Sequence, residues 1–154
     1  MALLLPVALL TGGVVAGMLL WSAIGGVPWM RRLSGPEYVR LHRFWSPRFD
    51  PLAPIAVLIT IAADIALVAI GPARAARPAL IVAVAALAGV IAVSASRAAP
   101  LKRRVLALDP DRLPDDFAAR DPRADWQRWN LARTVLAMGA FAANAAAVGL
   151  LLST

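Results

Sequence analysis

The stretch Asp121–Leu152, DPRADWQRWNLARTVLAMGAFAANAAAVGLLL, joins a polar start to a long apolar run. Asp121 followed by Pro122 predicts a helix start, because aspartate caps free backbone N–H groups and proline suits the first helical turn. A helix from about Pro122 to Leu152 would be about 45 Å long. It would cross roughly 30 Å of hydrocarbon and keep its first turns outside.

Three more apolar runs of similar length precede it. Of the 154 residues, 60% are apolar, and the mean hydropathy is +0.71. A water-soluble domain of this size could not bury so much apolar surface, and lipid requires helices to satisfy the backbone. We therefore predict an all-α integral membrane four-helix bundle, a single domain over residues 1–154, with spans at approximately 2–27, 52–70, 79–96 and 122–152. The first run is uncharged up to Met30 and lacks a basic start, so we interpret it as a span rather than a secretory signal.

The basic residues are distributed unevenly between the connections. Five lie between the first two runs and eight between the last two, whereas the short turn Gly71–Pro78 carries only Arg74 and Arg77. The positive-inside rule places both long connections in the cytoplasm and both termini outside, in the cytoplasmic (inner) membrane. The net charge of +7 would then face anionic lipid headgroups rather than nucleic acid. The expected partner is the lipid bilayer.

The first long connection contains a second amphipathic pattern, EYVRLHRFWSPRF, at Glu37–Phe49. Tyr38, Leu41 and Trp45 fall on one helical face, away from Arg40 and Arg43. The pattern predicts a short helix that lies in the membrane interface.

Polar residues on the last helix share one face. Trp126, Asn130, Arg133 and Asn144 fall within an arc of about 60°. A polar stripe on a membrane helix is expected to face the bundle interior. Trp129 and Arg133 could also serve as ordinary interfacial anchors, but Asn130 belongs to no anchoring class.

Asp64 lies about twelve residues into the second span, near the bilayer centre. A carboxylate there is costly unless it is protonated, hydrogen-bonded or paired. Arg133 would be offset from it by about 15 Å along the helix axes, whereas Asn144 and Thr11 lie nearer its depth. We predict a structural polar pair of Asp64 and Asn144 that fixes helix packing, and keep a proton-handling role open.

The remaining polar residues gather at the end that carries the long connections. Topology brings Ser22, His42, Asn130 and Arg133 to this membrane face. His42 is the only histidine, and its unperturbed pKa near neutrality makes it the natural proton acceptor, although a surface role stays open. The chain has no cysteine, so thiolate metal sites are excluded, and we expect no metal and no cofactor within one chain. A haem would need a ligand from a second subunit.

Several motifs resemble those of a known family. Trp126–Arg133 reads W-x-R-W-N-x-x-R after a Pro-containing loop, and Ser46–Pro54, SPRFDPLAP, forms a Pro-containing entry to the second span. Pro100-Leu101-Lys102 stands where the family tends to have P-x-N. The chain resembles the anthrone-oxygenase-like family of small four-helix membrane proteins, which is largely of unknown function.

The resemblance implies a membrane-embedded, cofactor-independent oxygenase that converts planar aromatic polyketide anthrones to anthraquinones with O2. On this hypothesis His42 is the catalytic base, and Asn130 and Arg133 are catalytic donors to the substrate anion. The residues expected to bind the hydrophobic aromatic substrate are Ser22, Trp45, Trp126 and Trp129.

Two other functions fit the same residues. The chain could be a non-catalytic membrane module that binds lipid or a hydrophobic small molecule, or that packs as a subunit, including in a homo-oligomer. A small transporter centred on Asp64 is disfavoured, because four spans without a pair of broken helices make a poor pathway.

Overall fold

The computed structural model describes residues 3–70 and 74–152, and every regular element within them is helical. This confirms the all-α prediction. The elements, in chain order, are α1 (Leu4–Trp21), η1 (Ser22–Gly26), α2 (Val27–Met30), α3 (Gly35–Phe49), α4 (Leu52–Ile70), η2 (Arg74–Ala76), α5 (Arg77–Val93), η3 (Ser94–Ala98), α6 (Ala99–Ala107) and α7 (Arg123–Leu152).

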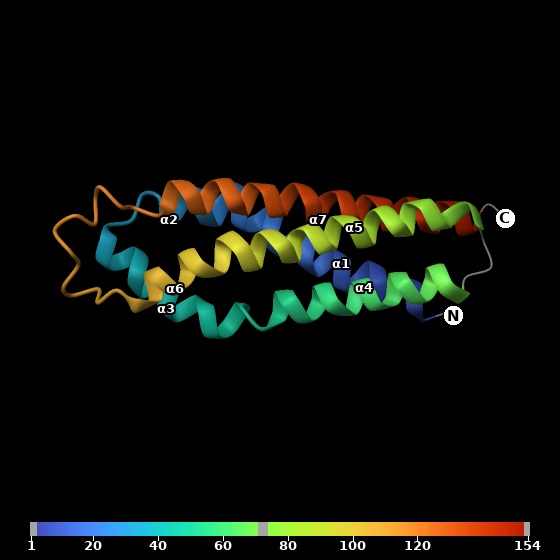
Figure 1. The fold of residues 1–154 in the computed structure, drawn as a ribbon, viewed down its shortest axis with the longest axis horizontal. Coiled ribbons are helices and arrows are strands. Elements are labelled where there is room, and N and C mark those ends of the chain that lie inside the picture. Colours follow the sequence, from blue (N-terminus) through green and yellow to red (C-terminus); the bar gives the residue numbers. More distant parts are fainter. Residues whose placement is uncertain (1–2, 71–73, 153–154) are drawn as a thin grey trace.

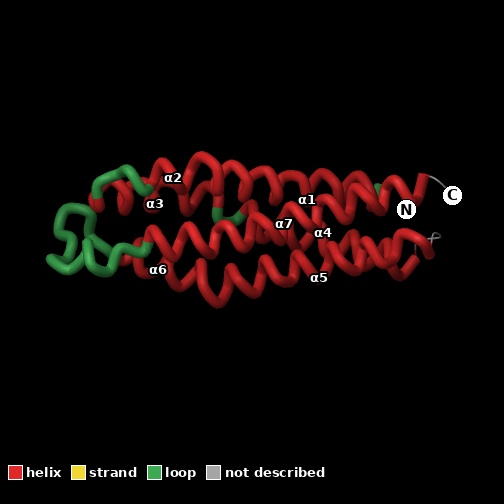
Figure 2. The backbone as a smooth tube through the Cα atoms, turned by 90° about the horizontal axis from the view of Figure 1, so that it is seen from above, coloured by secondary structure: helices red, strands yellow, loops and turns green. Residues whose placement is uncertain are grey.

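These elements form four lengthwise rods, each a long helix or a succession of helices (Figure 1). The rods are α1–α2, α3–α4, η2–α6 and α7, and each is long and apolar enough to cross a membrane by length and composition. Figure 2, turned by 90°, shows the same lengthwise packing with the longest loop at one end. Both ends of the chain lie at the opposite end of the bundle (Figure 1). The fold is thus a four-helix bundle compatible with a multi-pass membrane protein.

Two rods extend beyond the predicted spans. The first continues through η1 to Met30, and the third continues from the predicted end at Ser96 to Ala107. The third rod does not stop where its apolar run stops, because the arginine- and alanine-rich residues beyond it are good helix formers. Of the predicted turn Gly71–Pro78, residues 71–73 lie outside the described residues, and Arg74–Ala76 form a 3₁₀ turn.

The helix expected in the first long connection is α3. Its start is a capping box: the Ser34 N–H donates to Glu37 Oε2 at 2.8 Å, and the Glu37 N–H donates back to Ser34 Oγ at 3.5 Å. Tyr38 and Val39 are fully buried, in one apolar cluster with Met30 of α2 and Val105 of α6. α3 therefore packs on protein along one side, and its position in the membrane interface stays a prediction.

The centre of the bundle is filled by small and branched side chains. Val15 of α1, Ala83 and Leu87 of α5, and Ala137 and Ala140 of α7 are each at most 1% exposed. Small residues on facing helices allow the backbones to approach closely, which is how membrane helices gain packing energy. This packing holds α1, α4, α5 and α7 in fixed register.

α7 begins as the sequence predicts. Asp121 accepts hydrogen bonds from the backbone N–H of Arg123 at 2.9 Å and from its guanidinium. Arg123 also donates to the carbonyl oxygens of Leu33 (2.5 Å) and Met30 (3.3 Å). Burial opposes ionisation of Asp121, but the hydrogen bonds and charge of Arg123 prevail and hold its pKa below the usual range. The start of α7 is thus fastened to the end of α2.

Candidate active site at the charged end of the bundle

A cavity of about 630 Å³ lies among all four rods, on the side of the two long connections. Its wall is mainly apolar, and it falls within the range of roughly 300–1,000 Å³ typical of small-molecule sites. The polar side chains that line it come from different rods. They are Ser22, His42, Ser46, Asp50, Ser94, Lys102, Arg103 and Arg133.

Two π-helical turns contribute to the cavity wall. η1 supplies Ser22, and η3 supplies Ser94, Ala95 and Ala98. A π turn holds an extra residue in the helix and is often found at functional sites. The wider turns allow these short side chains to form part of the wall on both sides.

His42 is buried, 5% exposed, and lines the cavity. Its Nδ1 lies 3.2 Å from the carbonyl oxygen of Tyr38, one turn earlier in α3. A carbonyl oxygen only accepts, so the hydrogen bond assigns the proton to Nδ1 and leaves Nε2 with its lone pair in the neutral ring. The ring is held between Tyr38, at 4.4 Å between centroids, and Trp126, at 5.4 Å. The arrangement can present an unprotonated nitrogen to a ligand.

Asn130 links α7 to η1. Its Oδ1 accepts hydrogen bonds from Arg133 Nη2 at 3.0 Å and from Ser22 Oγ at 3.4 Å. Thr134, also buried on this face, donates to the carbonyl oxygen of Leu19 at 3.1 Å. These contacts fix the rotation of α7 against α1, and so the direction in which Arg133 points.

Three buried donors at this place have no hydrogen-bond partner within the described residues: Trp126 Nε1, Asn130 Nδ2 and Arg133 Nε. Trp126 and Arg133 line the cavity, and the Arg133 guanidinium carbon lies 5.5 Å from the Trp126 ring centroid. Buried donors are nearly always paired in folded proteins, and each unpaired one costs free energy. The cluster is therefore suited to an acceptor oxygen, in particular a negatively charged one.

Neither Asp50 nor Lys102 is among the site residues predicted from the sequence. Asp50, at the end of α3, forms an ion pair with Lys102 of α6, and both side chains line the cavity. The Lys102 ammonium also lies 5.5 Å from the Trp126 ring centroid. Two signals were available: an aspartate inside the Pro-containing entry Ser46–Pro54, and a lysine where the family pattern has asparagine.

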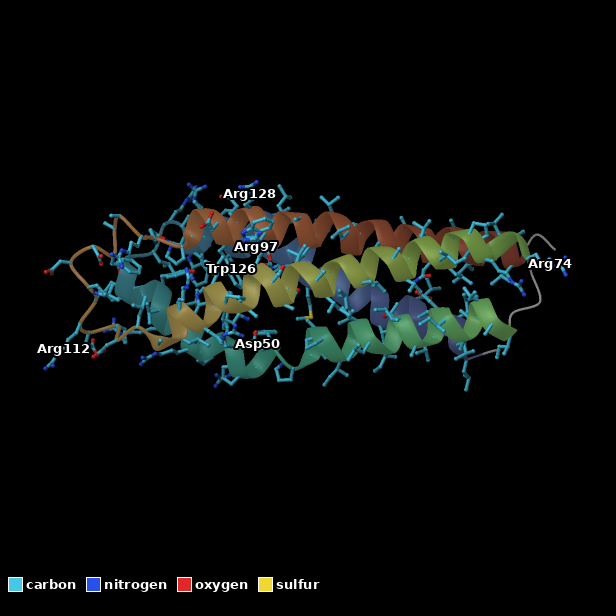
Figure 3. All side chains as sticks on the ribbon, viewed as in Figure 1. Asp50, Arg74, Arg97, Arg112, Trp126 and Arg128 are labelled. Carbon is cyan, nitrogen blue, oxygen red and sulfur yellow. The ribbon has the colours of Figure 1, made fainter. Side chains whose placement is uncertain are left out.

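The four predicted substrate-binding residues separate into two groups. Ser22, Trp45 and Trp126 line the cavity. Trp129 lies elsewhere, with the guanidinium carbons of Arg97 and Arg128 at 5.2 Å and 5.1 Å from its ring centroid. Figure 3 shows Arg128 above the α7 ribbon and Arg97 below it. One residue along a helix turns a side chain by about 100°, which separates Trp129 from Asn130.

The deeper polar pair is separate from the cavity. Asn144 Nδ2 donates to Asp64 Oδ2 at 3.1 Å, and both residues are at most 1% exposed. Thr11 of α1 and Thr60 of α4, one turn before Asp64, are hydrogen-bonded to each other, with 2.7 Å between their hydroxyl oxygens. Arg133 donates to Asn130, and the side chain that donates to Asp64 is Asn144, in keeping with the offset expected between Arg133 and Asp64.

Four membrane-length rods around an apolar cavity, with a polar cluster at one end, are compatible with a small multi-pass helical membrane protein. The sequence model of the family described as anthrone oxygenase matches residues 43–143, well over half of the chain. The chain belongs to the anthrone oxygenase family. No curated protein and no solved structure matches it.

The matched segment contains Asp50, Lys102 and the stretch Trp126–Arg133. It begins one residue after His42 and ends one residue before Asn144. Family membership suggests an oxygenase-like role. The role of His42 rests on its position in the cavity alone.

Proposed function

We propose that the protein is a membrane-embedded, cofactor-independent oxygenase that oxidises a planar, anthrone-like aromatic with O2. The observation that carries the proposal is the meeting of a buried histidine with two unpartnered donors, Trp126 Nε1 and Arg133 Nε, around one apolar cavity. His42 offers a base, and Trp126 and Arg133 offer hydrogens to the oxygen that becomes negative, while Asn130, beside the cavity, holds Arg133 and has a free Nδ2 of its own.

The reaction begins with loss of a proton. His42 Nε2 takes a proton from the benzylic CH2 of the anthrone, and the electron pair moves into the ring system and onto the carbonyl oxygen. Arg133 and Trp126 stabilise that oxygen with their free N–H groups. A low-dielectric surrounding strengthens these contacts relative to water.

The anion then reacts with O2 at the same carbon. One electron passes to O2, the two radicals combine into a C–O bond, and the peroxide takes the proton held by His42. Loss of the second benzylic hydrogen as the O–O bond breaks gives the quinone carbonyl and water. The balance is one anthrone plus one O2 to one anthraquinone plus one water, and the substrate supplies all the electrons.

The cavity wall suits this class of substrate. Trp45 and Trp126 present aromatic rings, and apolar residues of α1, α4 and α5 form most of the remaining surface. A flat apolar molecule gains free energy from burial there, and aromatic contacts add to it. We place both long connections in the cytoplasm and the termini outside the inner membrane, so the substrate would enter from the bilayer.

The test is turnover by the purified full chain in detergent, followed as O2 uptake and quinone absorbance with an anthrone. His42→Ala and Arg133→Gln should each lower turnover by about 100-fold or more, as loss of a base or a charge-stabilising donor does. Arg128→Gln is the matched control, since Arg128 is exposed on the same helix and loses the same charge. If His42→Ala keeps the wild-type rate, His42 is not the base.

A non-catalytic binding module is the second candidate. The cavity itself favours it, because 630 Å³ of mostly apolar space would hold a lipid or hydrophobic molecule without any chemistry. Mass spectrometry of the protein extracted from its native membrane separates the two. A retained phospholipid together with no turnover of any anthrone would support the binding module over the oxygenase.

A further inference from the structure

A second concave site lies outside the cavity, between the third rod and α7. This basic notch, of about 190 Å³, is lined by Ser96, Arg97, Pro100, Leu101, Arg104, Asp125 and Trp129. It shares no lining residue with the cavity. The proposed function makes no use of it.

The notch exists because α6 separates from α7. α5 packs on α7, but α6 turns toward α3, as Figure 1 shows. The gap that opens is closed at one side by Trp129 and left open at the outer surface, where Arg97 and Arg104 are exposed. A gap that was only a packing defect would be lined by apolar atoms, whereas three of the seven residues that line this one are charged, Arg97, Arg104 and Asp125.

The charges favour an anion. Arg97 and Arg104 are seven residues apart, about two turns, so both face the notch from one side of the rod. No ion pair is recorded for either in the described part of the chain, and Asp125 is the single carboxylate among the lining residues. Arg128 adds a third cation beside Trp129. Arginine binds phosphate oxygens with paired N–H groups, so a phosphate fits this site better than a lone carboxylate would.

The surroundings favour a lipid as the source of the phosphate. α5 and α7 carry exposed apolar side chains along the bundle, among them Ile91, Leu131 and Val135. Trp129 has the amphipathic ring typical of the headgroup level. Basic pockets between membrane helices are known to bind anionic headgroups. We infer that the basic notch binds the phosphodiester of an anionic glycerophospholipid, with the acyl chains along α5 and α7 and the headgroup hydroxyls toward Asp125.

The test reconstitutes the full chain in nanodiscs that contain phosphatidylglycerol, phosphatidylethanolamine and phosphatidylcholine, and counts retained lipid by native mass spectrometry. The wild type should retain phosphatidylglycerol in preference to both others. Arg97→Gln with Arg104→Gln should lower that preference at least about tenfold, given the usual contribution of each arginine. The control, Arg32→Gln with Arg112→Gln, removes the same charge from exposed positions in the two long connections and should keep the preference.

Brominated lipids give a second measurement that does not depend on the arginine variants. Brominated phosphatidylglycerol should quench tryptophan fluorescence more than brominated phosphatidylcholine does, and Trp129→Phe should remove that excess. Three results would overturn the site: equal retention of all three lipids, equal loss of preference in both arginine pairs, or excess quenching that survives Trp129→Phe. If millimolar inorganic phosphate displaced phosphatidylglycerol, the bound phosphate group would not need to come from a lipid, and that part of the proposal would be wrong.

Discussion

The ring of His42 lies edge-on to the ring of Trp126, with 5.4 Å between centroids and 80° between planes. The contact joins α3 to α7 across the cavity. Trp126 therefore has two separate functions in the proposed site: its ring holds the histidine, and its unpartnered Nε1 can donate to a substrate oxygen.

Two substitutions of Trp126 should separate these functions. Trp126→Phe keeps an aromatic ring but removes the donor, so turnover should fall about 100-fold while the protein unfolds at nearly the wild-type temperature. Trp126→Ala should also lower the free energy of unfolding by about 3–5 kcal/mol. Parallel turnover and thermal-unfolding measurements check both. Full activity in Trp126→Phe would show that Nε1 is not a donor.

The ion pair between Asp50 and Lys102 should contribute modestly to stability. Its side chains are 41% and 24% exposed, which screens the charges. A double-mutant cycle with Asp50→Asn and Lys102→Met should give a coupling energy of about 1 kcal/mol. The matched control is Arg40 with Asp111, whose side chains are 55% and 72% exposed and whose coupling should be close to zero. A larger coupling energy for Arg40 with Asp111 than for Asp50 with Lys102 would contradict the expectation that the less exposed pair is the stronger one.

Asp64 and Asn144 should behave as a packing pair. Asp64→Leu leaves Asn144 buried without its acceptor, and should lower the free energy of unfolding by about 1–3 kcal/mol. Asp64→Leu combined with Asn144→Leu removes both polar groups and should recover much of that loss. Unfolding is measured in a detergent and denaturant series. If Asp64→Asn abolished activity without destabilising the protein, a proton-handling role would replace the packing role.

The start of α7 should make stability depend on acid pH. Because the folded pKa of Asp121 lies below its unfolded value, the unfolded chain binds more protons. The contribution of Asp121 is therefore complete above the unfolded pKa of about 3.9, and is lost as the pH falls through the folded value. Thermal unfolding between pH 7 and pH 3 should show this loss in the wild type. Asp121→Asn should be less stable at pH 7 and flatter below pH 4, whereas Asp115→Asn, in the same exposed loop, should follow the wild type.

The four-helix architecture could be predicted from the sequence, because an apolar run long enough to cross a membrane must form a helix to satisfy its backbone hydrogen bonds. The polar face of α7 was accessible for the same reason: helical spacing places Trp126, Asn130 and Asn144 on one side, and all three are buried. Topology alone brought His42 to the same end of the bundle. These predictions depend on the helical spacing of polar residues and on the order of spans and loops, and both can be read directly from the sequence.

The details of the site could not be predicted from the sequence in this way. The ion pair of Asp50 with Lys102 depends on the angle at which α6 approaches α3, and hydrophobic periodicity gives no information on that angle. That Trp129 lines a second site, rather than only facing lipid, depends on the gap that α6 leaves beside α7. The π turns are also invisible in the sequence, because the same residues would form an ordinary α-helix if packing did not select the wider turn.

Those π turns determine where the chain can lose a residue without misaligning its helices. Each holds one residue more than a regular turn requires, at Ser22–Gly26 and Ser94–Ala98. Deleting one residue there, such as Ala23, would restore a regular helix and keep both flanks facing as before, whereas deleting Val14 would rotate everything after it by about 100°. Single-residue deletions are therefore tolerable at two places in the long rods, and both border the cavity. Related chains that differ by one residue at either place would enclose differently shaped spaces within the same bundle.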